Sequence, residues 1–185
     1  MKITHSPLTT VMVLLSLSIA LLFTACASNR MTRQEKAAKQ ALLAQEIINA
    51  LNDRHYQIDV HNATPDGWGR IIHLTSLYSV TVSGDSIISY LPFFGRAYSV
   101  PYGGGSGLNF KGVIHRYEAA VTRKGEHIIY MDVESEEDTY RYIISLFENG
   151  RASISVTPRR RSHISFDGNY HQQEEITQLS QVERS

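Results

Sequence analysis

The sequence predicts an α+β fold in which one N-terminal amphipathic helix packs on a curved, mostly antiparallel sheet, a meander of about seven strands. Apolar side chains recur at helical spacing over residues 33–52, and from Tyr56 onward they alternate with polar ones. The later connections are short and contain Gly84, Gly125 and Gly150, which indicates antiparallel hairpins because a parallel crossover needs about a dozen residues or more.

Residues 1–25 have the layout of a secretory signal peptide. Lys2 precedes an apolar run from Val11 to Phe23, and small residues follow the run. A positive start, an apolar middle and a small-residue end are typical of a signal that is removed after export. The run is shorter than the roughly 20 apolar residues of a bilayer span, so a signal peptide is favoured over a retained membrane helix.

Cys26, the only cysteine, directly follows this segment in the stretch LLFTAC. The stretch resembles the lipobox of bacterial lipoproteins, and the resemblance implies that Cys26 becomes the first mature residue and carries a diacylglycerol thioether and an N-acyl chain. Two or more acyl chains suffice for stable membrane attachment. Lipidation is favoured over a buried free thiol, because Cys26 lies outside any later core. The residues after it complete a short tether, 26–31, that reaches about 17 Å when extended.

The residue after the cysteine bears on the location of the anchor. This residue is Ala27. In bacterial lipoproteins an aspartate at this position directs retention at the inner membrane, so by the same sorting rules Ala27 argues against retention there. The stretch ASNRM at 27–31 also lacks the acidic cluster that directs some lipoproteins to the cell surface. The resemblance therefore implies an anchor in the outer membrane of a Gram-negative cell, with the chain on the periplasmic face. The expected partners are the membrane, through Cys26, and an envelope protein or a small ligand.

Length and charge limit the remaining classes of protein. The 18 basic and 18 acidic residues leave no net charge, so the chain lacks the basic field that nucleic-acid binding requires, and we expect no nucleic-acid partner. The length of 185 residues suits one domain, which we place at 32–171. The polar tail at 172–185 is predicted to be disordered.

The predicted helix begins with a capping box. Thr32 is followed three positions later by Glu35, and in a capping box the two side chains reciprocally satisfy backbone N–H groups of the first turn. The apolar face of the helix is predicted from the residues that recur at helical spacing, Ala37, Ala41, Ala44, Ile48 and Leu51. Alternation then predicts strands near 56–61, 70–82, 86–91, 113–122, 126–135, 139–147 and 151–157.

The register of two hairpins follows from keeping large apolar side chains on one face. A two-residue turn after 139–147 would place Leu146 opposite Ser153 and split the apolar sets between the two faces. A three-residue loop, 148–150 with Gly150 in a left-handed conformation, places Leu146 opposite Ala152, and we predict this register. The same reasoning predicts the other cross-strand pairs, Ile144–Ile154, Ala119–Ile129 and Tyr117–Met131.

The stretch FFGRAYSVPYGGGSG lies within a predicted loop at 92–112 that combines aromatic residues with glycines. A loop of this length without structure is usually functional or wrongly assigned. In one interpretation it is an apolar lid, in which Phe93, Phe94, Tyr98 and Phe110 fold over an open sheet end. In the other it is a shallow ligand or partner site formed by Arg96, Tyr98, Tyr102, Gly103, Gly104 and Gly105.

Known catalytic and cofactor motifs do not fit this loop. The glycines lack the Gly-Lys-Ser/Thr of a phosphate-binding loop, and Ser106 lacks the second glycine of a nucleophile elbow. The mature histidines show no paired metal-ligand spacing. We therefore predict no catalytic residue, no cofactor and no metal.

Strand direction places three unusual segments at one end of the predicted sheet: the 92–112 loop, the acidic connection at 134–138, and the arginine run at 159–161. The acidic residues Asp132, Glu134, Glu136 and Asp138 are open to two interpretations, a calcium site or a solvated connection, of which the second is favoured. Arg159, Arg160 and Arg161 would contact lipid phosphate or neutralise the acidic connection.

Three stretches together carry a family resemblance: GDSIISYLPFFGRAYSVPYGGGSGLNFKG, EDTYRYIISLFENGRASISV and RSHISFDGNY. They resemble the domain of unknown function 4251 family (DUF4251) of small Gram-negative lipoproteins, over roughly residues 35–170. The resemblance implies a lipoprotein with a mostly antiparallel sheet and transfers no catalytic residue. We expect a non-catalytic binding or scaffold module that uses the 92–112 loop; the alternative is an envelope hydrolase or transferase with its site in the same loop.

Overall fold

A computed structural model describes residues 32–171, except 68 and 99–106. The chain divides into two compact units, Met1–Ala37 and Ala38–Ser185, and the described strands lie in the second unit. The described elements are the helix α2 (Arg33–Asn52) and the strands β1 (His55–Pro65), β2 (Ile72–Ser83), β3 (Ser86–Pro92), β4 (Gly107–Val121), β5 (Glu126–Glu134), β6 (Thr139–Phe147), β7 (Arg151–Pro158) and β8 (Ile164–Tyr170).

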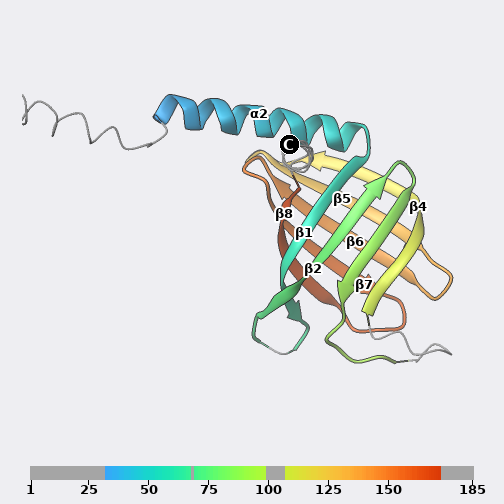
Figure 1. Cartoon of the computed structure of the whole chain (residues 1–185). Helices are drawn as coiled ribbons and strands as arrows, with labels where there is room; N and C mark the ends of the chain where they lie inside the picture. Colours follow the sequence, from blue (N-terminus) through green and yellow to red (C-terminus); the bar gives the residue numbers. More distant parts are fainter. Residues whose placement is uncertain (1–31, 68, 99–106, 172–185) are drawn as a thin grey trace, which may run out of the picture. The chain divides into compact units, whose positions relative to one another are not determined.

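The strands form a closed antiparallel barrel in chain order (Figure 1). The predicted fold, a helix on a curved open sheet of about seven strands, is therefore wrong. The closing strand is β8, which pairs with β1 from Ile58 opposite Tyr170 to Pro65 opposite Ile164. The sequence of β8 contains Asp167 and Gly168, which are depleted in strands, so its propensity did not predict a strand.

Helix α2 has the predicted bounds and the predicted capping box. The Thr32 backbone N–H donates to Glu35 Oε2 at 2.7 Å, and the Glu35 N–H donates to Thr32 Oγ1 at 3.2 Å. The predicted apolar face is only partly correct, because Ala37 and Ala41 are exposed. The buried helix residues are Ile47 and Leu51, on its C-terminal half.

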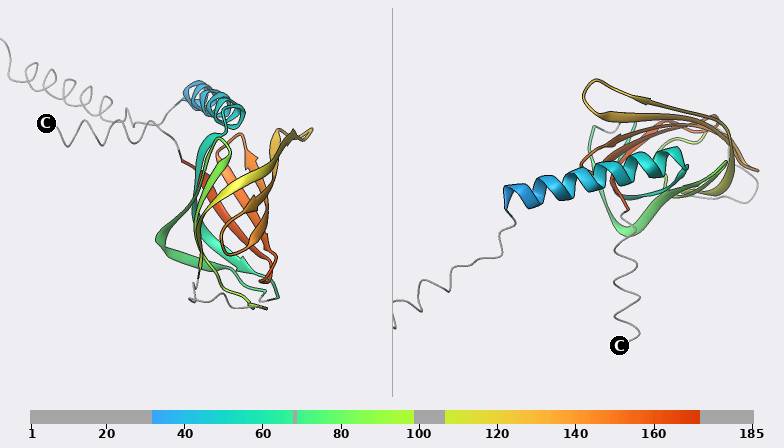
Figure 2. Two further views of the ribbon diagram at one scale, coloured as in Figure 1. Left: turned by 90° about the vertical axis from the view of Figure 1, so that its right-hand side faces the viewer. Right: turned by 90° about the horizontal axis from the view of Figure 1, so that it is seen from above.

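The C-terminal half of α2 covers one end of the barrel, as Figure 2 shows from two sides. The apolar face of the sheet lies inside the closed barrel, so Ile47 and Leu51 reach the core at the end of the barrel. The Tyr170 hydroxyl donates to Glu46 Oε1 at 3.1 Å, which links the helix to the closing strand. Among the described residues, no helix has the length and hydropathy of a membrane span.

The barrel interior is a packed core rather than a channel. Side chains alternate between buried and exposed along β5, β6 and β7, and the buried ones join the core. The Tyr142 hydroxyl lies inside and donates to Ser89 Oγ at 3.1 Å. Burial raises the pKa of Tyr142. The largest fully buried side chains are Tyr142, Phe166, Ile47, Ile58, Ile87, Leu91, Leu108, Ile129, Met131, Ile144, Leu146 and Ile154.

The predicted hairpin registers are confirmed. Leu146 lies opposite Ala152, and Gly150 has the predicted left-handed conformation with φ of 82°. The remaining predicted pairs are also present, Ile144–Ile154, Ala119–Ile129 and Tyr117–Met131.

Bulges interrupt two strands at histidines. Along β1 the pairing with β8 shifts between Val60 and Asn62, so His61 is an extra residue. Along β4 the pairing with β5 shifts between Ile114 and Arg116, so His115 is an extra residue. Bulges redirect side chains and are frequent beside functional sites.

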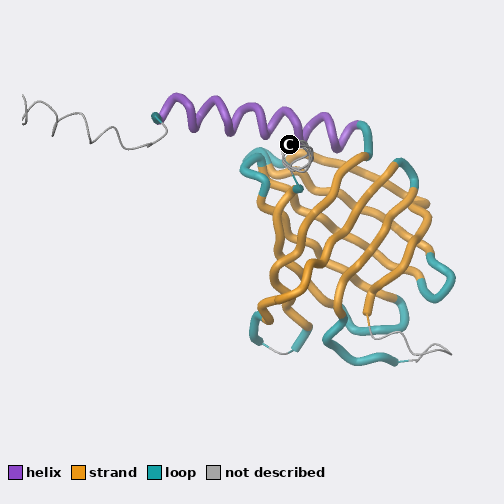
Figure 3. Tube along the Cα trace, in the orientation of Figure 1, coloured by secondary structure: helices purple, strands orange, loops and turns teal. Residues whose placement is uncertain are grey.

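Loops gather at the barrel end away from α2 (Figure 3). This end holds the β1–β2, β3–β4, β5–β6 and β7–β8 connections, whereas the tight turns at Gly84, Gly125 and Gly150 lie at the helix end. The antiparallel topology thus separates a tightly turned end from a loop-rich end.

Candidate functional site

Three connections meet at the loop-rich end, as strand direction predicted. The β3–β4 connection pairs with the β7–β8 connection: the Tyr98 N–H donates to the Arg160 carbonyl at 2.8 Å, and the Ser162 N–H donates to the Arg96 carbonyl at 2.9 Å. Between these bonds Ala97 and Arg161 form an isolated antiparallel bridge. The described part of the aromatic loop is therefore held in place by backbone hydrogen bonds.

The three consecutive arginines of the β7–β8 connection have different surroundings. The Arg160 N–H donates to Asp138 Oδ2 at 3.1 Å, and its guanidinium donates to the Glu137 carbonyl at 3.2 Å. Arg160 thus contacts the acidic β5–β6 turn, through its backbone N–H to a carboxylate and through its guanidinium to a backbone carbonyl. Arg161 is only 8% exposed, donates to the Gly107 carbonyl at 2.9 Å and lies 5.2 Å from the Phe93 ring centre.

The described part of the aromatic loop both covers the core and faces solvent. Phe93 and Phe94 pack against the core, whereas Arg96 is exposed and Tyr98 is 72% exposed. Between them, Gly95 permits the close approach of Ser162, because a Cβ there would lie 2.5 Å from Ser162 Oγ. The lid interpretation therefore holds for the two phenylalanines, while Arg96 and Tyr98 remain available for contacts.

The predicted loop is shorter than expected at its C-terminal end. Residues 107–112 belong to β4, where Gly107 pairs with Pro92 and Phe110 pairs with Ser89. The Phe110 ring stacks on Tyr140 with centroids 4.2 Å apart, so Phe110 contacts a strand residue and is no part of a loop lid. The other predicted contact residues, Tyr102, Gly103, Gly104 and Gly105, lie outside the described residues, as do Cys26 and the segments 1–25, 26–31 and 172–185.

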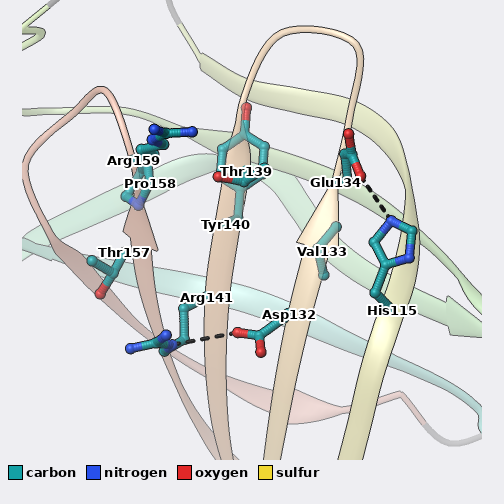
Figure 4. Close-up of a pocket in the computed structure, with 10 residues that line it drawn as sticks. All are labelled: His115, Asp132, Val133, Glu134, Thr139, Tyr140, Arg141, Thr157, Pro158 and Arg159. Carbon is teal, nitrogen blue, oxygen red and sulfur yellow. Dashed lines mark hydrogen bonds and ion pairs between the residues drawn. The ribbon is translucent and has the colours of Figure 1, made fainter.

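A groove of about 410 Å³ crosses strands β4 to β7 beside the loop-rich end (Figure 4). Strand alternation points its charged and hydroxyl side chains outward, while the core lies behind them. The residues that line it are His115, Asp132, Val133, Glu134, Thr139, Tyr140, Arg141, Thr157, Pro158 and Arg159. The groove joins the aromatic loop through the β7–β8 connection, since Arg159 precedes the residue that binds Tyr98.

Two polar pairs hold the wall of the groove. At the β4 bulge, His115 Nε2 lies 2.9 Å from Glu134 Oε2. On the next strands, Asp132 accepts from Arg141 Nε at 3.4 Å. All four side chains are substantially exposed, so the pairs stabilise the barrel by only about 0–1 kcal/mol each. Their main effect is to fix the direction of the groups.

A further ion pair extends this network along β4. Arg116 donates to both carboxylate oxygens of Glu118 at 2.9 and 2.8 Å and lies 3.9 Å from Asp132. The bidentate hydrogen bond from Arg116 lowers the pKa of Glu118, and the same bond raises the pKa of Arg116. The outer wall of β4 to β6 is therefore covered by paired charges.

Arg159 differs from Arg141, the other arginine that lines the groove. Its backbone N–H donates to the Thr139 carbonyl at 3.0 Å, which fixes the position of the residue on the groove rim. Among the described residues, none forms a hydrogen bond or an ion pair with its guanidinium. A guanidinium in a groove that Thr139 and Thr157 also line suits a carboxylate or phosphate group.

A second hollow of about 250 Å³ lies between β1 and β2. His171 Nδ1 lies 2.7 Å from Asp59 Oδ2, and Gln57 Nε2 donates to Asp59 Oδ1 at 2.8 Å. The bulged His61 lines the same hollow.

Among the described residues, no histidine contacts both a hydroxyl and a carboxylate. His115 and His171 contact Glu134 and Asp59, whereas His55 contacts the hydroxyl of Ser83. His163 contacts two hydroxyls, those of Thr157 and Ser165. Hydrolytic triads need one histidine to join both kinds of group.

The acidic connection uses its carboxylates for internal contacts. Asp138 accepts from the Thr139 and Arg160 N–H groups, and Glu134 faces His115. In the part of the chain that the structure describes, no group of three or more His, Cys, Asp or Glu side chains is arranged to hold a metal ion.

Sequence reasoning located the loop-rich end but missed the groove. The groove residues come from four strands, and outward positions of a strand carry no signal of a site by themselves. The signal that was available is the charge pattern of β4 and β5, since the confirmed register places His115 and Arg116 beside Glu134 and Asp132.

The fold and the site define a closed eight-stranded antiparallel barrel with a shallow polar groove on its outer wall. The family model named Domain of unknown function (DUF4251) matches residues 38–170, and the chain belongs to this family. A crystal structure of a DUF4251 family protein from Bacteroides eggerthii is similar, with a TM-score of 0.58 and 16% sequence identity over 72% of this chain and 89% of that one. This likeness supports the fold. No curated protein matches the chain.

Proposed function

We propose that the chain is a non-catalytic binding module, held on the periplasmic face of the outer membrane through lipidated Cys26, that binds its ligand at the loop-rich end of the barrel. One observation carries the proposal: backbone hydrogen bonds join the exposed residues Arg96 and Tyr98 to the β7–β8 connection, which continues into the groove at Arg159. These backbone hydrogen bonds thus connect the described part of the loop to the residue that follows Arg159 of the groove.

The chemistry of this surface favours an anionic ligand or an acidic segment of an envelope protein. Arg159 and Arg96 present guanidinium groups, which bind carboxylate and phosphate oxygens in pairs. The exposed ring of Tyr98 offers a flat surface for an apolar or cationic part of the same ligand.

The contacts of the histidines limit the kind of catalysis that this surface could perform. Among the described histidines, none joins a hydroxyl to a carboxylate as a hydrolytic triad requires. An envelope hydrolase or transferase is the second candidate function, and the His115–Glu134 pair in the groove is the observation that favours it, because such a pair can act as a general base.

Crosslinking and affinity capture of the full membrane-anchored chain test the binding surface. The variant carries Arg96→Ala, Tyr98→Ala and Arg159→Ala, and the matched control carries Arg123→Ala, Tyr130→Ala and Arg151→Ala, also exposed. We expect the variant, at equal thermal stability, to lose partners that wild type and control both retain. The same captured partners for all three chains would refute the proposed surface.

Two further measurements separate the remaining parts of the proposal. Metabolic labelling with a fatty acid is expected to label the wild type and not Cys26→Ser; a label that survives this substitution would refute the anchor. Turnover of envelope substrates that is lost in His115→Ala, with partner capture unchanged, would favour the hydrolase or transferase over the binding module.

A further inference from the structure

The ladder between β2 and β3 covers only part of β2. Their ladder runs only from Ser79 opposite Tyr90 to Ser83 opposite Ser86, although β2 begins at Ile72. On its other side β2 pairs with β1, where Tyr78 lies opposite Val60 and His73 lies opposite Asn62. The residues between them, 74–77, have no ladder partner among the described residues. We call residues 72–78 the free edge of β2.

The free edge lacks the features that guard exposed strands. Natural edge strands carry charges or proline that prevent pairing with another chain. The free edge, IHLTSLY, contains neither, and its only histidine, His73, contacts Asn62 Oδ1 at 2.7 Å. The neighbouring strand β3 has such a feature, because it ends in Pro92, whose nitrogen carries no hydrogen to donate to a partner strand.

Apolar side chains accompany the free edge. Leu77 is 94% exposed, the highest value among the exposed large hydrophobic residues of the described chain. Ile71 precedes the edge and is more than half exposed, and Tyr90 of β3 stacks on Tyr78 with centroids 5.4 Å apart. Exposed apolar groups beside unpaired backbone mark a surface that is stabilised by a partner strand.

We propose that the free edge of β2 pairs with the same edge of a second copy of this chain. A two-fold axis relates two identical edges in antiparallel order, and we place it at Thr75, the centre of the edge. Leu77 of each copy then lies opposite His73 of the other, which removes it from water.

Charge and length favour a second copy as the occupant. The free edge contains no Asp, Glu, Lys or Arg, so two copies bring no like charges together. The outer wall of β4 to β6, by contrast, carries Arg116, Asp132 and Arg141, which would face their like across a two-fold axis. The free edge is also longer than an average strand of about 5–6 residues, so it can form a complete ladder.

Cysteine crosslinking of the full chain tests the pairing and its register. Thr75→Cys places a thiol on the proposed axis, and Ala120→Cys places one at an exposed position of β4 as a matched control. We expect mild oxidation to convert Thr75→Cys to a covalent dimer, with Ala120→Cys and wild type at background level. Equal crosslinking of all three chains would overturn the proposal.

Analytical ultracentrifugation of the full chain in detergent tests the interface without a crosslink. Leu77→Lys places two ammonium groups at the interface, and we expect it to raise the dimer dissociation constant at least about tenfold. Ala120→Lys adds the same charge elsewhere and is expected to leave that constant unchanged. A monomeric wild type, or a dimer insensitive to Leu77→Lys, would overturn the proposal.

This inference is independent of the proposed binding function, because the free edge lies on β2 and the groove lies on β4 to β7. A chain that dimerises through β2 and captures no partner would refute only the binding surface. A monomeric chain that captures partners through Arg96 and Arg159 would refute only the pairing.

Discussion

The β5–β6 wall and the β2 strand differ in how completely their backbones are paired. Every residue from Glu126 to Glu134 has a partner in β6, and burial alternates along both strands. In β2 the pairing is interrupted on the β1 side and stops at Ser79 on the β3 side. The barrel thus concentrates its packing in one wall and leaves backbone groups of the other wall available for association.

The difference arises from where apolar residues face. Along β6 the buried positions are Tyr140, Tyr142, Ile144 and Leu146, so every second residue of the strand packs in the core. Along β2 only Val80 and Val82 are fully buried, and both lie in its second half. The first half of β2 adds one partly buried residue, Leu74, to the core, and Tyr78 follows it, so we expect this half to change partners at a lower cost in stability than β6 would.

The largest expected contrast is in hydrogen exchange. For Leu77→Lys kept monomeric, we expect amides of residues 74–77 to exchange almost without protection. The amides of Tyr142 and Ile144 are expected to exchange only through global unfolding, at an opening free energy of about 5–15 kcal/mol. Mass spectrometry of the exchanged peptides measures both regions, and equal protection would show that β2 is fully paired.

Truncation of the core gives the next largest effect. Phe166 is fully buried on the closing strand, so Phe166→Ala is expected to lower the free energy of unfolding by about 3–5 kcal/mol. The control Leu77→Ala changes an exposed side chain and is expected to stay within about 0.5 kcal/mol of a monomeric reference. Urea unfolding measures both, and similar losses would remove the contrast between the walls.

The closure between β1 and β8 depends on a glycine. A Cβ at Gly168 would overlap the Asp59 carbonyl beside the His61 bulge. Gly168→Ala is therefore expected to destabilise the barrel by about 1–3 kcal/mol, while Asn169→Ala on the same strand changes it little. Thermal unfolding measures the difference; a neutral Gly168→Ala would mean that the two strands can separate without loss.

Alkaline pH is expected to weaken the well-packed wall. Burial raises the pKa of Tyr142 above its ordinary value of about 10, so the unfolded chain loses this proton first. The contribution of Tyr142 to the free energy of unfolding is therefore retained below about pH 10. Above that pH it falls by up to about 1.4 kcal/mol per pH unit. The free energy of unfolding, measured at several alkaline pH values, should fall less steeply with pH for Tyr142→Phe than for the exposed control Tyr98→Phe. Identical slopes would contradict the raised pKa of Tyr142.

The smallest expected effect lies on the groove wall. Arg141 pairs with Asp132 in an exposed geometry, so Arg141→Ala is expected to change the free energy of unfolding by at most about 1 kcal/mol. Urea unfolding checks this value. A loss as large as that of Phe166→Ala would mean that the groove charges belong to the packed wall rather than to its surface.

Local patterns accounted for much of the described chain. The capping box, the bounds of α2 and the register at Leu146 and Ala152 were predicted because each depends on residues close together in sequence. The family assignment to DUF4251 was also predicted, from the three quoted stretches. The meeting of the loops followed from strand direction, which alternates in any meander.

Several features depended on contacts between distant residues. Alternation reports which face of a strand is apolar but not which strand lies beside it, so an open sheet and a closed barrel have similar patterns. The groove could not be predicted because a polar residue such as Thr157 is typical of any exposed strand position. The extent of β4 was missed because Gly107 and Gly112 resemble loop residues, although close packing requires them to be small.

By itself, the sequence determined the helix, most of the strands, two hairpin registers and the end at which the loops meet. Only the tertiary structure decided that β8 pairs with β1, that α2 covers a barrel end, and that β2 keeps a free edge. The physical reason is the range of the interactions. Turns and caps are set by neighbours in the chain, whereas closure is set by whether the last strand can approach the first, which here depends on Gly168 beside the His61 bulge.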